Sequence, residues 1–457
     1  MRTLTFYRPI LCALLLAFSG LAGAQQPPNI VLIIADDLGY GDIGAYGQQR
    51  IQTPNIDALA AGGLRFTDYY AGSTVCAPSR EALLTGMHTG HTFIRGNFLT
   101  DEQEDPALPD TKVTIAELLK KAGYRTALFG KWGLGGEGRG PETQGFDRSV
   151  CYLDQIQAHN YYPAFVYEDG KKRALDSVYS HHLFANETLA FISEQDKSQP
   201  FFLYLPYTLP HGKHVIPDDA PYTDMDWPEQ FKNYAAMITL LDRDVGRIMQ
   251  ALDKHGLAEN TLVLFMSDNG ANPAFAKFFR SNGPLRGAKR DLYDGGIRVP
   301  LVVNWPGRVQ AGQTTAHISA AWDILPTLCE AAGIVPPSYI DGLSLLPLLT
   351  GHDEKQRQHT YLYWENYTYN YDWDKPQQKR PRNWLENRAV RYGKWKGVQH
   401  SLYENPDAPI ELYDVAVDPG ETRNLAADHP DLVREIREIF ANTATTAPYF
   451  PYTKPTR

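Results

Sequence analysis

Short apolar runs alternate along this chain with stretches of helical periodicity, and this alternation restricts the possible folds more than any other feature. The runs with the composition of strands are Asn29–Ala35, Arg125–Phe129, Thr261–Met266 and Val299–Asn304. The first of them is a continuous apolar run, which is typical of a central strand buried on both faces. A sheet with such strands needs helices on both sides, so the pattern predicts an α/β fold.

Helix signals lie between the strand-like runs. Thr114 and Glu117 form a capping box, and Gly123 closes the helix that they begin. A longer helix has one apolar stripe and is ended by Gly256. The residues of that stripe are Tyr234, Ile238, Leu241, Val245, Ile248 and Leu252. The order of strands and helices predicts an α/β sandwich around a mostly parallel sheet.

The composition changes to aromatic and polar after the run 345–351. Beyond it, a short unit at 389–398, a strand-like run at 410–413 and a helix at about 430–441 predict a small sheet with one packed helix. We therefore expect a large domain over residues 25–350 and a small C-terminal subdomain over residues 351–457, with an antiparallel sheet and a helix.

The N-terminus has the pattern of a secretory signal. Arg2 and Arg8 precede an apolar run that ends in Ala22-Gly23-Ala24, which predicts a signal peptide over residues 1–24 with cleavage near Ala24. No later stretch has the length of a transmembrane helix, so no membrane span is expected in the mature chain. The predicted location is the periplasm or the outside of the cell.

The chain has four cysteines, of which Cys12 lies in the predicted signal. Cys76 belongs to a motif considered below, which leaves Cys151 and Cys329. These two can form a disulfide or serve as two small buried hydrophobic residues, and we favour the second interpretation.

Polar side chains follow two of the predicted strands directly. Asp36 and Asp37 come after the first strand, and Asp268 and Asn269 come after another. Open α/β sheets bind ligands at the carboxyl ends of their strands, so these side chains are expected to meet there. Carboxylate and amide oxygens suit a hard cation such as calcium or magnesium. Either pair taken alone also fits a turn or a helix cap.

The run CAPSR at residues 76–80 has the form CxPxR and is followed closely by LLTG. Both motifs resemble the signature of type I sulfatases. The resemblance extends from Asn29 to Pro451 through IIADDLGYGDIGAYG, GKWGLG, PHGKH, MSDNG and RGAKRDLYDGGIRVP, in the order and spacing of that family. It implies an alkaline-phosphatase-like fold, with a large mixed sheet between helices and a smaller C-terminal α+β subdomain.

The resemblance also implies a site and a reaction. In this family a maturation enzyme oxidises the cysteine to formylglycine, whose hydrate is the nucleophile, and one calcium ion is bound per chain. The implied metal-binding residues are Asp36, Asp37, Cys76, Asp268 and Asn269. The implied catalytic residues are Cys76, Arg80, Lys131, His211 and Lys289.

Elementary chemistry gives each of these residues a role in cleaving a sulfate ester. A cation binds sulfate oxygen and acidifies a hydroxyl that it holds, and Asp268 is a candidate to take the proton. Arg80 and the helix N-terminus hold the modified side chain and favour an anion. Lys131 and Lys289 clamp the sulfate, and His211 protonates the departing oxygen.

Without the resemblance, a lone lysine is usually a solvated charge and a lone histidine usually makes a local hydrogen bond. The formal net charge of −9 repels an anionic substrate at long range, so a local basic pocket is required.

One position departs from the family pattern. Type I sulfatases commonly have KWHLG where this chain has KWGLG, and the missing histidine normally helps to release sulfate from the hydrate. Gly133 stands in its place, and His88, His91 and His159 are candidates to replace it.

The motifs MHTGHTFIRGN and AHNYYP resemble those of bacterial sulfatases that act on sulfated carbohydrates. This resemblance implies a substrate of the galactose or N-acetylgalactosamine type, and no nucleic-acid partner is expected. The segment 159–163, with Phe278, Phe279 and Asn282, would line a sugar-binding mouth, although aromatic residues more often pack in cores. The block 375–382 would contact further anionic groups or be a solvated loop. The alternatives are a phosphatase or phosphonate or phosphodiester hydrolase on the same scaffold, and a non-catalytic protein that binds sulfated glycans.

Overall fold

A computed structural model describes residues 26–97, 107–367 and 384–450 of the chain. The predicted signal peptide and the charged block 375–382 lie outside these residues.

The described strands are β1 (Asn29–Asp36), β2 (Leu64–Phe66), β3 (Tyr69–Tyr70), β4 (Arg125–Lys131), β5 (Arg148–Tyr152), β6 (Phe165–Glu168), β7 (Lys171–Ala174), β8 (Phe201–Pro210), β9 (Thr261–Ser267), β10 (Leu301–Asn304), β11 (Gln313–Thr315), β12 (Ser319–Ala320), β13 (Leu362–Tyr367), β14 (Leu385–Tyr392), β15 (Trp395–Gln399) and β16 (Ile410–Asp414). The described α-helices are α1 (Pro54–Ala61), α2 (Cys76–Thr85), α3 (Ile115–Lys121), α4 (Ser180–Ser193), α5 (Glu229–Lys254), α6 (Pro273–Phe279), α7 (Asp294–Ile297), α8 (Ile324–Ala331), α9 (Leu346–Leu349) and α10 (Pro430–Asn442).

The large sheet has ten strands in the order β11-β2-β10-β9-β1-β8-β4-β5-β6-β7. Its centre, from β9 to β5, is parallel, as the alternation of strands and helices predicts. Antiparallel pairs join β10 to β9 on one side and β6 to β5 on the other. The sheet is therefore mixed, with the parallel strands in the middle.

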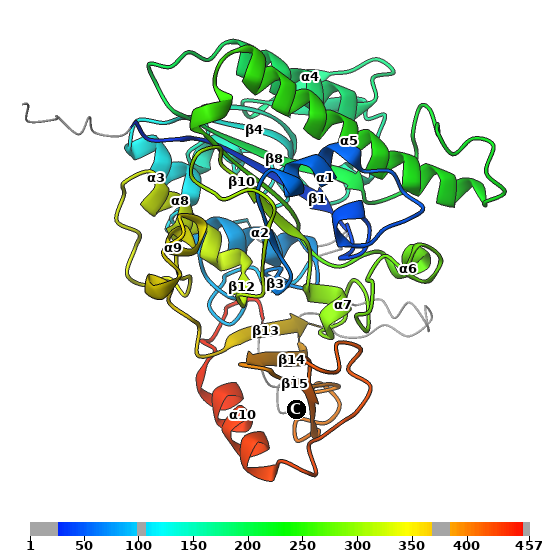
Figure 1. The fold of residues 1–457 in the computed structure, drawn as a ribbon, viewed down its shortest axis with the longest axis vertical. Helices are drawn as coiled ribbons and strands as arrows, with labels where there is room; N and C mark the ends of the chain where they lie inside the picture. The colour runs from blue at the N-terminus through cyan, green and yellow to red at the C-terminus, as the bar shows by residue number, and fades with distance from the viewer. Residues whose placement is uncertain (1–25, 98–106, 368–383, 451–457) are drawn as a thin grey trace, which may run out of the picture.

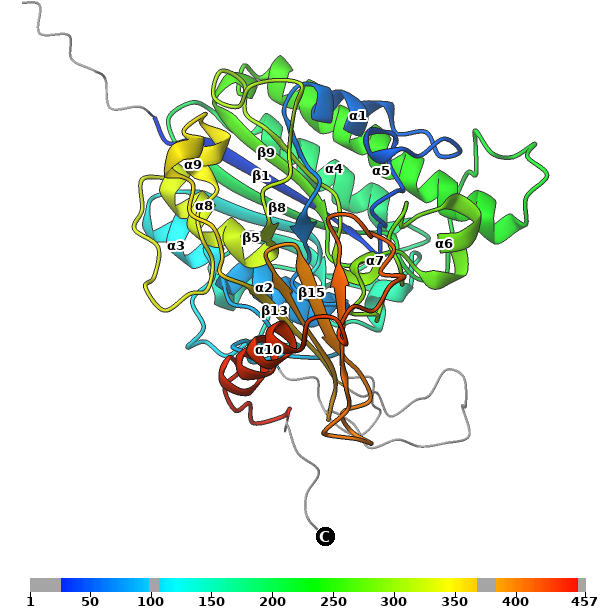
Figure 2. The same cartoon turned by 60° about the horizontal axis from the view of Figure 1, so that its bottom comes forward.

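Helices cover both faces of this sheet, and the continuous apolar run of β1 is explained by that arrangement. Val31 and Ile33 belong to the core cluster that includes buried residues of α4 and α5. Ile30 and Leu32 point the other way, into the cluster that includes residues of α3 and α8. Figure 2 shows β9, β1 and β8 side by side between these two groups of helices.

The predicted helix signals are confirmed. Thr114 Oγ1 accepts a hydrogen bond from the backbone N–H of Glu117, and the Glu117 carboxylate accepts one from the N–H of Thr114, so the capping box is complete. The stripe on α5 is buried against the sheet layer along its length. A helix with one apolar stripe gains most of its stability from such burial.

The C-terminal part forms a second, four-stranded antiparallel sheet in the order β13-β14-β15-β16, with α10 packed on it (Figure 1). The short unit predicted at 389–398 contains parts of β14 and β15, which form a hairpin in this sheet. The small sheet contacts helix α7 and the residue that follows β3: Trp364 Nε1 donates to the carbonyl of Ala71 at 2.9 Å, and Lys396 pairs with Asp294 at 2.7 Å. The domain boundary near residue 350 remains a prediction.

Cys151 and Cys329 are both free and buried. The structure therefore supports the interpretation as small buried hydrophobic residues over the disulfide. Among the described residues, no helix has the length and apolar character needed to cross a membrane.

Candidate active site

The predicted site residues gather at the carboxyl edge of four adjacent parallel strands. Asp36 is the last residue of β1, and Lys131 is the last residue of β4. His211 directly follows β8, and Asp268 directly follows β9. Parallel strands end at the same edge of a sheet, so four segments far apart in the sequence reach one point there.

Helix α2 brings the cysteine to this edge. Cys76 is its first residue, and the Cys76 Sγ lies 3.3 Å from Asp36 Oδ1. Ser79 Oγ donates to the carbonyl of Asp268 at 2.5 Å, which fixes the first turn of the helix against the end of β9. The N-terminus of a helix carries partial positive charge, so this placement favours an anion at Cys76.

Three buried cations pair with three buried carboxylates around the cysteine. Arg80 Nη2 lies 3.2 Å from Asp36 and 2.8 Å from Asp268, and Lys131 Nζ lies 2.7 Å from Asp36. Lys289 Nζ lies 2.6 Å from Asp37 and 3.8 Å from the Cys76 sulfur. The attraction within such ion pairs is strong where water is excluded. The three positive charges equal the three negative charges, so the six groups together have no net charge.

The same burial shifts the pKa values of these groups. Burial alone would raise the pKa of Asp36, but the buried cations Lys131 and Arg80 outweigh it and hold that pKa well below its usual value. Burial, followed by the charge of Asp36, raises the pKa of the Cys76 thiol to about 12. Burial also lowers the pKa of His211 to about 3. The unmodified cysteine is therefore a protonated thiol at neutral pH, and the His211 ring is neutral.

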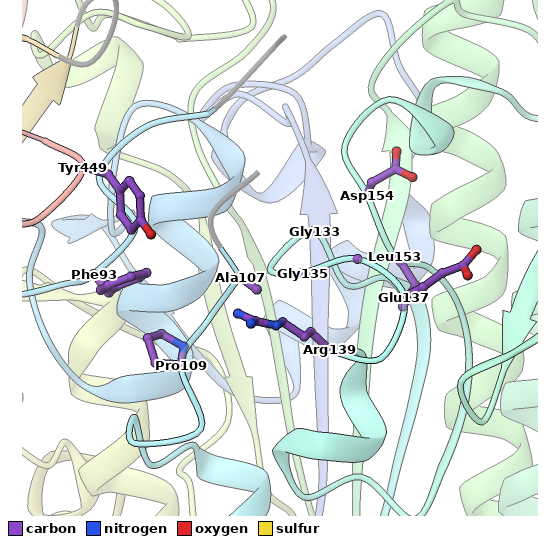
Figure 3. A pocket seen from close by; sticks show the side chains of 11 residues that line it. Phe93, Ala107, Pro109, Gly133, Gly135, Glu137, Arg139, Leu153, Asp154 and Tyr449 are labelled. Carbon is purple, nitrogen blue, oxygen red and sulfur yellow. The ribbon is translucent and has the colours of Figure 1, made fainter. Parts of the chain in front are cut away.

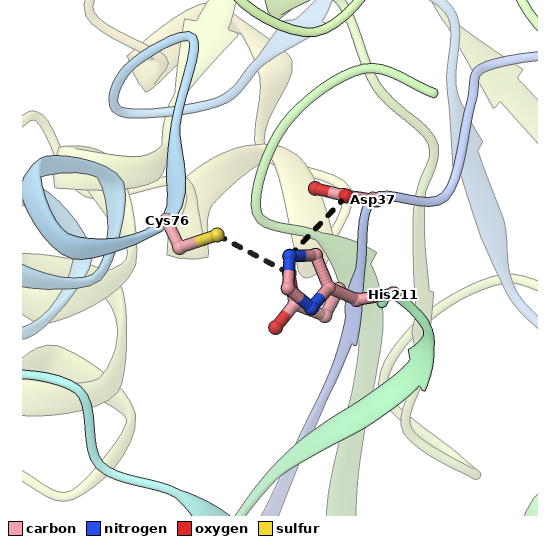
Figure 4. Close-up of side chains that lie close together, drawn as sticks. Asp37, Cys76 and His211 are labelled. Carbon is pink, nitrogen blue, oxygen red and sulfur yellow. Dashed lines mark hydrogen bonds and ion pairs between the residues drawn. The ribbon is translucent and has the colours of Figure 1, made fainter. Parts of the chain in front are cut away.

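The oxygen atoms at this point fit a hard cation. Ligand atoms of Asp36, Asp37, Cys76 and His211 all lie within 4.8 Å of one another, and Figure 4 shows three of these side chains pointing together. The Oδ1 atom of Asn269 is buried and has no hydrogen-bond donor, while its amide nitrogen donates to Asp37 at 2.8 Å. A buried amide oxygen beside carboxylates is the kind of donor that calcium and magnesium take.

The structure thus brings all the predicted catalytic and metal-binding residues into one cluster. The three candidate replacements for the missing histidine are separated. His88 and His91 stack on each other and contact Asp341 instead. Only His159 touches the cluster, with its ring centroid 4.4 Å from that of His211.

The residues predicted to line a sugar-binding mouth do not all lie at the cluster. Phe278 and Phe279 pack against Trp227 and Phe231 in an aromatic group. Asn282 is buried, and its side chain bonds the backbone of Gly287 at 2.7 Å. These residues stabilise the loop that follows β9, so of the predicted mouth only the segment 159–163 reaches the cluster.

Sequence reasoning missed Gln155, which the structure places against Gly133. A Cβ atom at Gly133 would lie 2.4 Å from Gln155 Nε2 and 3.6 Å from Lys131 Cε. That nitrogen donates to the Gly133 carbonyl at 2.9 Å. The glutamine therefore occupies the space of a side chain at position 133, and the glycine in the motif was the only signal for it.

A cavity of about 770 Å³ opens beside this loop (Figure 3). Gly133 and Gly135 form part of its wall, and Arg139 points into it. Phe93 and Tyr449 stand on the opposite side. The volume of this cavity is in the usual range for a small-molecule site. One of its lining residues, Gly133, follows Lys131 by two positions in the sequence.

Comparison with known proteins decides the family. The sulfatase family profile matches residues 28–334, and the profile for N-sulphoglucosamine sulphohydrolase, C-terminal, matches residues 287–444. Human arylsulfatase A is 34% identical over 477 residues, which cover 93% of this chain and 90% of the relative. The chain belongs to the sulfatase family. This sulfatase is accordingly a sulfuric ester hydrolase, as its sequence predicts.

Other relatives agree with this assignment. N-acetylgalactosamine-6-sulfatase from Homo sapiens is 35% identical, over 72% of this sulfatase and 67% of the relative. The crystal structure of Ps i-CgsB in complex with k-i-k-neocarrahexaose has a TM-score of 0.80 at 28% identity, covering 93% of this sulfatase and 95% of that chain. The likeness confirms the predicted alkaline-phosphatase-like α/β fold with a large mixed sheet and a small C-terminal antiparallel sheet.

Proposed function

We propose that this sulfatase hydrolyses sulfate monoesters on a sulfated carbohydrate of the galactose or N-acetylgalactosamine type. Formylglycine made from Cys76 is the nucleophile, and one calcium ion is bound per chain. The observation that carries the proposal is the position of Cys76, at a helix N-terminus and in contact with Asp36, Lys289 and the other buried charges.

The state of the cysteine supports its conversion. A thiolate is the reactive form of cysteine, and burial raises the pKa of Cys76 to about 12, so a thiolate is scarce at neutral pH. A hydrated aldehyde at this position supplies a hydroxyl nucleophile without needing a thiolate. Arg80 is fully buried one turn further along α2 and is placed to orient that side chain.

The cation is held, in this proposal, by Asp36, Asp37, Asp268 and Asn269, together with the modified Cys76. When bound, it supplies Lewis-acid stabilisation of sulfate oxygen and lowers the pKa of a hydroxyl that it holds. The carboxylates and the ammonium and guanidinium groups already balance, so a divalent ion leaves an excess of two positive charges. This local excess attracts a sulfate monoester despite the net charge of −9 of the whole chain.

Residues on either side of the cysteine complete the proposed machinery. Lys131 and Lys289 are buried ammonium groups that bind sulfate oxygens and stabilise the charge that develops on them. His211 protonates the departing sugar oxygen. Its Nδ1 atom is buried without a partner. Burial lowers the pKa of this ring and outweighs the charges of Asp36 and Asp37, which raise it, so the ring acts as an acid only after it has taken up a proton.

A saccharide substrate is supported by the relatives and by a cavity at the loop that follows Lys131. N-acetylgalactosamine-6-sulfatase and the neocarrahexaose complex are among the proteins that this chain resembles. The cavity beside Gly133 has room for more than a single sulfate group. From the sequence pattern of residues 1–24 we propose that the enzyme is exported to the periplasm or secreted.

The test is to produce the chain with and without a formylglycine-generating enzyme. Mass spectrometry of the peptide with Cys76 is expected to show conversion to the aldehyde only in the first case. Sulfate release from defined galactose and N-acetylgalactosamine monosulfates is then expected for the converted protein and not for Cys76→Ala. Full activity of Cys76→Ala would refute the nucleophile.

The same preparation tests the phosphatase and phosphonate hydrolase alternatives. Rates on an aryl sulfate and the matching aryl phosphate are measured side by side. A faster rate on the sulfate is expected, because the family and the relatives that this chain matches are sulfatases. A faster rate on the phosphate would reassign the reaction.

A further inference from the structure

The segment that replaces the missing histidine side chain is attached to both sides of the catalytic cluster. At its beginning, Gln155 donates to the carbonyl of Gly133, next to Lys131. At its end, the hydroxyl of Tyr161 donates to the carbonyl of His211 at 2.5 Å and to that of Thr208 at 2.8 Å. Tyr161 is buried, so this second attachment is not loosened by water.

His159 lies between these two attachments, at the end of a short 3-10 helix over Gln157–His159. Its ring contacts the His211 ring, while it is itself only partly buried. His159 therefore stands on the solvent side of the group that protonates the departing oxygen. In the proposed function the alcohol attached to that oxygen must extend from the buried cluster toward solvent, and His159 is the more exposed of the two rings.

We propose that His159 contacts the sugar ring that carries the scissile sulfate and so contributes to the selection of a sugar over other alcohols. This inference rests on the proposed function. A neutral imidazole has one donor and one acceptor nitrogen; the donor bonds the backbone carbonyl of Gln155, which leaves the acceptor for a hydroxyl group next to the sulfated carbon of a sugar. Burial and the charge of Lys131 lower the pKa of His159, which keeps the ring in this neutral form.

The physical reason for selection is that a sugar and an aryl group differ in hydrogen bonding. A sugar hydroxyl pairs with the imidazole, whereas an aryl sulfate leaves it facing a ring with no matching group. Sites built to bond a hydroxyl discriminate against analogues that lack it, since their polar groups are then left unpaired. His159 is thus a specificity residue rather than a replacement for the histidine missing at position 133.

The test compares His159→Ala with the unchanged enzyme on two substrates, the galactose or N-acetylgalactosamine monosulfate that is hydrolysed fastest and an aryl sulfate. The ratio of kcat/KM for the sugar to kcat/KM for the aryl sulfate is expected to fall on the order of 10-fold, as for one lost hydrogen bond. The matched control is His255→Ala, a partly buried histidine that directly follows α5 and precedes the amino end of β9, at the sheet edge opposite the cluster. Its ratio is expected to stay within about 2-fold of the unchanged enzyme.

Equal losses of kcat/KM on both substrates would overturn the inference, because they would assign His159 to the sulfate transfer itself. An unchanged ratio with unchanged rates would overturn it as well. Binding of the sugar sulfate can also be measured without turnover, by calorimetry on the Cys76→Ser variant. Addition of His159→Ala to this variant is expected to weaken binding of the same sugar sulfate about 10-fold. If the enzyme released no sulfate from any ester, the proposed function would fail, and calorimetry with galactose 6-sulfate would still decide whether His159 binds the sugar.

Discussion

Replacement of Gly133 by alanine is expected to destabilise this sulfatase, for two separable reasons. The residue has φ of +68°, a left-handed conformation that costs a residue with a side chain about 1–2 kcal/mol. The new Cβ would also lie 2.4 Å from Gln155 Nε2, so the buried amide must move and lose its hydrogen bond to Gly133. That loss costs about 1–3 kcal/mol, which gives a total of about 2–5 kcal/mol.

Two other glycines of the same loop serve as controls that separate the conformational cost from the cost of the contact with Gln155. Gly138 has φ of +75° and no atom within 4 Å of its Cβ position, so Gly138→Ala carries the conformational cost alone. Gly136 has open space and no positive φ, so Gly136→Ala is expected to be nearly neutral. Urea denaturation followed by tryptophan fluorescence gives the free energy of unfolding of each variant.

Gln155→Ala completes the double-mutant cycle. In that background, Gly133→Ala is expected to cost only the conformational term, so the two substitutions should couple by about 1–3 kcal/mol. Additivity of Gly133→Ala and Gln155→Ala, or a cost for Gly133→Ala no larger than that of Gly138→Ala, would show that Gln155 does not occupy the space of a residue-133 side chain.

Three further outcomes are expected. Chelation with EDTA should lower the Tm of the converted enzyme and abolish sulfate release, with calcium restoring both, and a Tm that does not move would contradict a bound ion. Lys396→Met removes the shortest ion pair of the fully buried carboxylate of Asp294 and leaves it the longer pair with Arg298, so it should lower the free energy of unfolding in urea by about 3–5 kcal/mol. Lys172→Met, at the exposed pair with Glu137, should lower it far less. The hydrogen bond to Asp341 raises the pKa of His91, so this pair contributes fully below about pH 6.5 and its contribution is lost as pH rises through the folded-state pKa. The Tm difference between the unchanged enzyme and His91→Gln should therefore narrow from about pH 6 to about pH 9, and a constant difference would contradict this.

Features that depend on near neighbours in the chain were predictable from the sequence. The apolar run of β1 indicates burial on both faces, because successive side chains of a strand point to opposite sides and all of them are apolar. The capping box before α3 involves two residues three positions apart, so the pattern is complete within one helical turn. The acidic pairs were placed correctly because parallel strands share one carboxyl edge.

The edges of the large sheet were less predictable. β2, β10 and β11 are only three or four residues long, and their pairing depends on which segment lies beside β9. The hairpin of β14 and β15 was read as a single unit, since a two-residue turn leaves little trace in an apolar pattern.

The sequence by itself determined the α/β class, the cysteine motif and the acidic residues at the strand ends, because each is encoded in a short stretch. The tertiary structure alone decided how these stretches meet. Lys289 reaches Asp37 from 252 residues away, and Gln155 fills the space left by Gly133 from the other side of β5. Such contacts depend on how the packed layers orient side chains from separate strands and loops, and no local pattern specifies that orientation.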